Sequence, residues 1–95
     1  VIHKALDDLH SSLSSSTDKL IEVYMGKYKK QPLEVFNINM SANSNASNII
    51  EYLETNREYI RTIRNKQFKS CSEIQNIIDD MLSSINQTIY LCNLK

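Results

Sequence analysis

The chain has 95 residues, equal numbers of acidic and basic side chains, and 41% hydrophobic residues. This length suits a single domain, residues 1–95, with a thin core between packed helices. One glycine and one proline are too few for the many turns of a sheet protein, so the composition predicts an all-α fold. Because its net charge is zero, the chain lacks the positive field typical of nucleic-acid-binding proteins. No apolar run is long enough to span a membrane.

A heptad pattern predicts a first helix over about residues 2–30. Apolar residues and one serine alternate in steps of four and three, at Ile2, Leu6, Leu9, Leu13, Ser16, Leu20 and Val23. The serines around Ser16 are poor helix formers, so this helix requires packing against other helices. A kink near residues 15–17, with Asp18 capping a second short helix, is the alternative. Pro32 ends the helical segment.

Residues 31–47 are predicted to connect this helix to the next one. The first half, Leu33–Met40, is apolar without helical spacing, and we expect it to lie extended against the helices. The second half is rich in Asn and Ser and is expected to be loose. A long crossover is the preferred interpretation, and a partner-binding loop that uses Phe36 is the alternative.

The stretch from Asn48 to Leu94 holds no glycine and no proline, and its apolar residues recur in steps of three and four. We predict two helices here, over about residues 48–68 and 71–93, that form an antiparallel hairpin. Ser47 or Asn48 is the expected N-cap of the first helix.

The predicted break between these helices lies near Lys69. Ser70 and Glu73 have the spacing of a capping box directly before an apolar run. The hairpin would bring Arg57 and Arg61 opposite Asp79, Asp80 and Ser83. A single helix over 48–94 is the alternative, because no glycine marks the break. Lysines gather where cations favour helix C-termini, at Lys27, Lys29, Lys30, Lys66 and Lys69.

We expect the helices to pack as in a coiled coil, around a core of leucine, isoleucine and one methionine. The predicted core residues are Leu6, Leu9, Leu13, Leu20, Leu53, Ile60, Ile63, Ile74, Ile78, Met81 and Ile85.

The final helix has a second apolar face formed by Ile77, Leu82 and Ile89. Together the two faces are wider than one neighbouring helix can cover, so we expect the second face to meet another chain. A homodimer is the default and a complex with another protein comes next. Tyr52 and Tyr59, seven residues apart on one helix edge, are further interface candidates.

One group of residues suggests chemistry: His3, Asp7 and His10 share a helix face and form a weak candidate zinc site. Beyond these, the sequence has no glycine-rich phosphate loop and no histidine near a cysteine. We therefore expect no enzyme activity, no cofactor and no small-molecule substrate.

A basic strip of Arg57, Arg61 and Arg64 lies beside tyrosines, which is one pattern of nucleic-acid-binding surfaces. Glutamates at positions 51, 54 and 58 lie among these arginines and would oppose a polyanion. Ion pairing within the protein or at an interface is the better interpretation, and we expect no nucleic-acid partner.

Cys71 and Cys92 lie 21 residues apart on one helical pattern, roughly 30 Å at the helical rise per residue. They are too distant to form a disulfide with each other and are expected to be reduced, which favours an intracellular protein over a secreted one. Three glycosylation sequons, which begin at Asn39, Asn45 and Asn86, favour the opposite.

The function predicted from these patterns is a non-enzymatic protein–protein interaction or assembly module that buries amphipathic helix faces. A secreted helical ligand or effector that binds a receptor is the alternative, supported by the sequons and by a start at Val1 that fits a processed protein.

Overall fold

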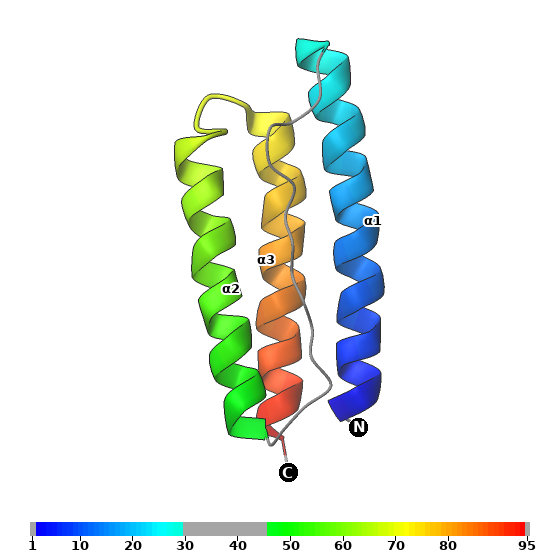
Figure 1. The fold of residues 1–95 in the computed structure, drawn as a ribbon, viewed down its shortest axis with the longest axis vertical. Helices are drawn as coiled ribbons and strands as arrows, with labels where there is room; N and C mark the ends of the chain where they lie inside the picture. The colour runs from blue at the N-terminus through cyan, green and yellow to red at the C-terminus, as the bar shows by residue number, and fades with distance from the viewer. Residues whose placement is uncertain (1, 30–45, 95) are drawn as a thin grey trace.

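The structure, a computed structural model, describes residues 2–29 and 46–94, which form three α-helices and no strand. α1 spans Ile2–Tyr28, α2 spans Ala46–Lys66 and α3 spans Ser72–Asn93. Both α1 and α2 pack against α3, which lies between them (Figure 1). α1 and α2 run in the same direction and α3 runs opposite to both (Figure 1). The prediction of an all-α bundle of three helices is confirmed.

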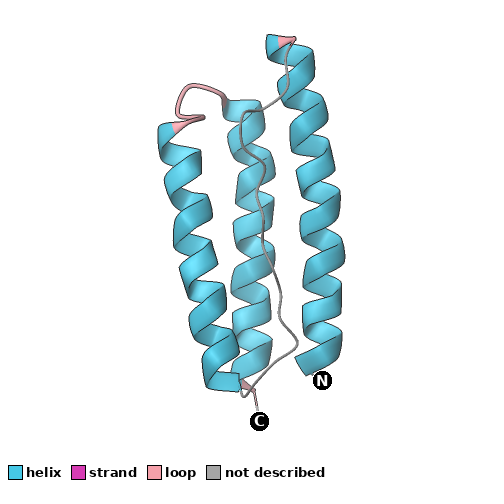
Figure 2. Cartoon of the chain, in the orientation of Figure 1, coloured by secondary structure: helices cyan, strands magenta, loops and turns pink. Residues whose placement is uncertain are grey.

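α1 continues through its serine-rich middle as one helix (Figure 2). Leu13 and Leu20, on either side of the serines, are only 6% and 4% exposed, so packing against α3 compensates for the weak helix propensity. The alternative in which Asp18 caps a second helix is wrong. α1 ends at Tyr28. The next residue, Lys29, adopts a left-handed conformation (φ 59°) and donates its backbone N–H to the Met25 carbonyl at 2.6 Å.

A short turn over residues 67–71 separates α2 from α3, so the alternative of one helix over 48–94 is wrong. The turn needs no glycine because none of its residues has a positive φ. Two of its side chains anchor it in the core: Phe68 is 7% exposed and Cys71 is 1% exposed. The Cys71 N–H donates to the Phe68 carbonyl at 3.1 Å, which closes the turn.

The predicted helix caps are wrong. α2 begins at Ala46, so Ser47 and Asn48 lie inside its first turn. The N-cap of α3 is Cys71 rather than Ser70, and the Cys71 side chain makes no capping hydrogen bond. Cys71 is 1% exposed, so this helix begins with its N-cap side chain in the core.

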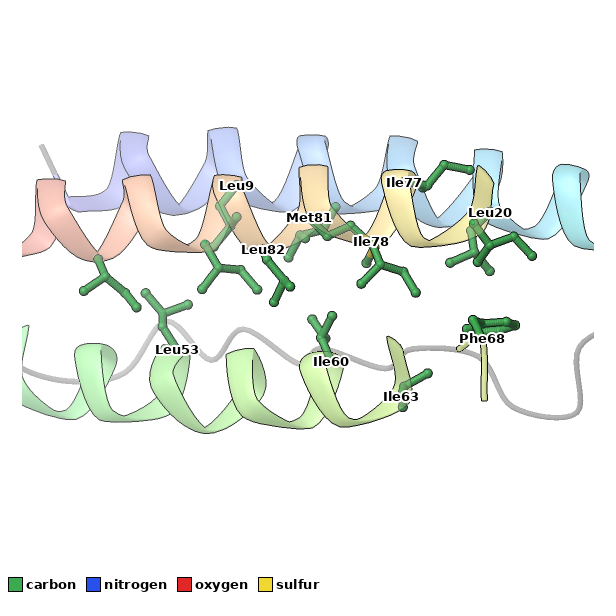
Figure 3. Close-up of a cluster of buried hydrophobic side chains, with 14 of the residues drawn as sticks. Leu9, Leu20, Leu53, Ile60, Ile63, Phe68, Ile77, Ile78, Met81 and Leu82 are labelled. Carbon is green, nitrogen blue, oxygen red and sulfur yellow. The ribbon is translucent and has the colours of Figure 1, made fainter. Parts of the chain in front are cut away.

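One core cluster collects apolar side chains from all three helices (Figure 3). Ten of the eleven predicted core residues are buried in it, and Leu6 is half-buried against it. The expected segment Leu33–Met40 lies outside the described residues. None of the described helices is long and apolar enough to cross a membrane.

The register of the α2–α3 hairpin differs from the prediction by about one helical turn. Arg64 forms a two-pronged ion pair with Asp79, at 2.6 and 3.2 Å, and Arg57 donates to the Asn86 carboxamide at 2.9 Å. Arg61 turns back to Glu58 on its own helix at 2.6 Å instead of crossing to α3. The shift arises because Phe68 and Cys71 fold into the turn, which moves its centre toward α3.

Candidate functional site

Basic side chains gather where α1 ends and α2 turns into α3. We call this surface the basic end and define it as residues 24–29 and 66–73. It carries four lysines, Lys27, Lys29, Lys66 and Lys69, and one acidic residue, Glu73. The side chains of Lys29, Lys66 and Lys69 are exposed and pair with no acid in the described part of the chain. The basic end is therefore a positively charged patch on a chain of zero net charge.

Aromatic rings join α1 to the turn at the basic end. Tyr24 meets the buried ring of Phe68 edge-on, with 6.0 Å between ring centroids. Tyr28 lies one turn further along α1 and packs on Tyr24, with centroids 4.9 Å apart. Tyr28 is 44% exposed and its neighbour Met25 is 38% exposed, so part of this cluster faces solvent. Met25 and Tyr28 therefore form an exposed surface that we call the apolar platform. Tyr24 and Phe68 support it on the side of the core, and lysines lie around it.

A polar clamp ties the same end of α1 to the start of α3. Lys27 Nζ donates to Glu73 Oε2 at 3.2 Å, and the Cys71 thiol donates to Glu73 Oε1 at 3.3 Å. The hydrogen bond to Glu73 raises the pKa of the Lys27 ammonium. The pKa of Glu73 is lowered by its own backbone N–H and then by the bonds from Cys71 and Lys27. Both groups therefore stay charged at neutral pH.

The opposite end of the bundle is acidic. Among the described residues it holds Asp7, Asp8, Glu51 and Glu54 against one lysine, Lys4, which pairs with Asp8 at 3.5 Å. α1 begins and α3 ends there (Figure 1). Charge is thus separated along the long axis, and the basic end is the end where α1 and α2 finish.

The predicted zinc ligands do not form a site. His3, Asp7 and His10 are all exposed on α1. Within residues 2–29 and 46–94, no three His, Cys, Asp or Glu side chains are placed to hold one metal ion.

The prediction that the second face of α3 needs another chain to cover it is wrong. Ile77, Leu82 and Ile89 are buried within this chain, at 6%, 8% and 9% exposure. Leu82 lies between Asp79 and Asn86, both of which bond to α2, and Figure 3 shows it facing that helix. Ile77 lies two helical turns before Ser84, which bonds to Ser12 of α1. The two apolar faces therefore serve two different neighbours.

The structure gives the other interface candidates different exposures. Tyr52 is half-buried against the core cluster, whereas Tyr59 is 47% exposed on α2. Phe36 lies outside the described residues.

The arginine strip is used for pairing within the chain, as the sequence indicated. Arg57 and Arg61 both lie near Glu58, at 3.8 and 2.6 Å, and Arg64 pairs with Asp79. Two carboxylates, Glu58 and Asp79, thus serve all three arginines within the chain.

A depression of about 260 Å³ lies between α1 and α3, away from the basic end. Ser12 and Ser84 share a hydrogen bond of 3.0 Å there, and Leu9 and Leu91 contribute apolar surface. Its one charged group is Asp8, which already pairs with Lys4. The depression marks a place where small side chains meet, with no pair of groups arranged for acid–base chemistry.

The cysteines agree with the prediction that they do not bridge. Cys71 and Cys92 lie at opposite ends of α3, and both are buried free thiols. Burial raises the pKa of the Cys92 thiol, which keeps it protonated and unreactive at neutral pH.

The basic end was not predicted as a site from the sequence, although each of its lysines was assigned to a helix C-terminus. The signal was present as two lysine clusters at two helix C-termini. Recognising one surface also requires knowing that α1 and α2 run parallel, which places both C-termini together.

Neither a curated protein nor a solved structure matches this chain. The profile of a family of unknown function, DUF5856, matches residues 2–92. This match includes all of α1 and α2 and nearly all of α3. The protein is therefore a member of the DUF5856 family.

Proposed function

We propose that this protein is a non-enzymatic protein-interaction module that binds a partner through the basic end. The observation that carries the proposal is the exposed pair Met25 and Tyr28 beside lysines that pair with no described acid. Aromatic residues and methionine are enriched in protein interfaces, and a charged surround gives a partner its orientation. The aromatic contacts below Tyr28 hold this surface in place, which reduces the ordering cost of binding.

Catalysis is not part of the proposal. A lysine acts as a nucleophile or base when its pKa is lowered, and Lys27 has the opposite shift because Glu73 holds its proton. The lysines of the basic end can attract an acidic partner, and the side chains of Met25 and Tyr28 can pack against it. A homodimer through Ile77, Leu82 and Ile89 is not proposed, because those residues are buried in the chain itself.

Site-specific photo-crosslinking tests the proposal in cells that make the protein naturally. A benzophenone amino acid replaces Tyr28, and the matched control carries it at Ser83, which is exposed on the outer side of α3. We expect a discrete protein adduct from position 28 that is missing from position 83. An adduct of twice the chain mass would identify the partner as a second copy. Equal labelling from both positions, or none from position 28, would contradict the proposal.

A further inference from the structure

We infer that the basic end binds a short acidic peptide segment that carries one large apolar side chain. This inference names the partner chemistry and rests on the proposed function. Three features of the basic end support this inference: the number of unpaired lysines, the apolar platform and the size of the surface.

The charge of the basic end selects an acidic ligand. Lys27 is already held by Glu73, which leaves the ammonium groups of Lys29, Lys66 and Lys69 to act on a ligand. They lie at one end of a bundle whose Cα atoms extend only 20 × 18 Å across its long axis. Interactions between exposed charges persist over about 10 Å at 0.1 M salt, so one ligand with several carboxylates can feel more than one lysine.

The platform selects an apolar side chain. Met25 and Tyr28 are three residues apart on α1, so their side chains are neighbours on the helix surface. Both are more than one-third exposed, and Tyr28 is supported from behind by Tyr24. An aromatic or large aliphatic side chain from a partner can cover these two residues while its flanking acids reach the lysines. A ligand with acidic side chains only would leave Met25 and Tyr28 in contact with water.

The size of the surface selects a short segment. The basic end comprises 14 residues, fewer than the roughly 20–30 that each partner contributes to a standard interface. A globular partner or a second copy would need additional contacts elsewhere. The Cα atoms of the bundle extend only 20 × 18 Å across its long axis, and an extended peptide of about six residues is long enough to cross that width. An anionic membrane is disfavoured because three free lysines attract it only marginally and neither apolar residue protrudes fully.

Fluorescence anisotropy with synthetic peptides tests the inference on the full chain. The probe is a labelled peptide of about eight residues, all Glu and Asp except for a central Phe. One control replaces the Phe with Ala, and the other replaces every acid with its amide. We expect the Ala peptide to bind about fivefold more weakly and the amide peptide to show no saturable binding. Raising the salt from about 0.05 to about 0.5 M should weaken the probe severalfold.

Matched protein variants locate the site. Lys66→Gln combined with Lys69→Gln should lower affinity for the probe about tenfold. Lys4→Gln combined with Lys19→Gln removes the same charge from exposed positions of α1 outside the basic end and should leave the affinity within twofold of the parent. An equal loss in both double variants would overturn the inference, because binding would then depend on net charge alone.

Other polyanions provide the competing outcomes. Phosphatidylserine vesicles or single-stranded polyuridine that bind more tightly than the probe, with the same dependence on Lys66 and Lys69, would overturn the peptide inference. Absence of probe binding would also overturn it. If a protein is still cross-linked at Tyr28 in that case, the proposed function stands and only the partner chemistry is wrong.

Discussion

Leu82 provides a direct test of whether the second face of α3 is core or interface. In the structure Leu82 is 8% exposed and belongs to the same cluster as Leu53 and Ile60 of α2 (Figure 3). Truncation of a buried leucine to alanine costs about 2–5 kcal/mol, and the slight exposure of Leu82 places it near the lower part of that range, about 2–3 kcal/mol. For a domain of this size, that loss corresponds to a fall in Tm of roughly 10–20 °C.

Thermal unfolding followed by far-UV circular dichroism measures this loss. Leu82→Ala should lower the Tm by the same amount at two protein concentrations about a hundredfold apart, because the core lies within one chain. Ser83→Ala, at the next and exposed position, serves as the control and should change stability by less than about 0.5 kcal/mol. Suppose that Leu82→Ala leaves the Tm nearly unchanged and that the Tm of the parent rises with protein concentration. This result would refute the assignment of Leu82 to the core and would place it in an interface between chains.

Ile78→Ala should destabilise by about 3–5 kcal/mol in urea titrations, because Ile78 is 0% exposed; a loss below about 1 kcal/mol would mean that its face is misassigned. A double-mutant cycle with Arg64→Ala and Asp79→Ala should give a coupling of about 0.5–1 kcal/mol, since the two-pronged pair is partly exposed. A coupling near zero would disprove this register. Because the pKa of Glu73 is lowered, its contribution is present above its ordinary value of 4.5 and is lost as pH falls below it. Glu73→Gln should therefore be less stable than the parent at neutral pH, and the difference should shrink in acid; a difference independent of pH would contradict this.

Hydrophobic spacing was sufficient to predict the helices and most of the core. Each helix has an apolar stripe with helical spacing. Residues at the centre of such a stripe, such as Leu53, Ile74 and Ile85, are buried whichever helix packs against it. The break near Lys69 was also predictable, because polar residues interrupt the stripe there. These features depend on local sequence alone, which explains why they could be inferred without knowledge of the topology.

The number of neighbours around α3 was not predictable in the same way. The sequence indicates that its apolar surface is wide, from Ile77 on one edge to Leu82 on the other. It does not indicate whether the second neighbour comes from the same chain. The assumption of one neighbour per helix led to the wrong interface, because the chain places both α1 and α2 on α3. The hairpin register failed for a related reason, since it depends on how deeply Phe68 and Cys71 enter the turn.

The lysines of the basic end have a structural explanation as well as a binding one. Helix C-termini carry partial negative charge, and a cation within the last turn stabilises them by about 0.3–1 kcal/mol. Because α1 and α2 run parallel, two such termini meet at this end. Helix stabilisation accounts for Lys27 and Lys66, which lie in the last turns of their helices. It does not account for Lys69, which lies in the turn beyond α2.

Lys69→Gln therefore separates the two explanations. If Lys69 serves binding, the variant should keep the parent's free energy of unfolding to within about 0.5 kcal/mol while its affinity for the acidic Phe peptide falls about threefold. Urea titration and peptide anisotropy on the same preparation give both quantities. Lys19→Gln, an exposed lysine within α1, is the control and should change neither. Unchanged affinity in Lys69→Gln would mean that this lysine contributes only to solubility, because neither the helix dipole nor an acidic partner would then explain its position.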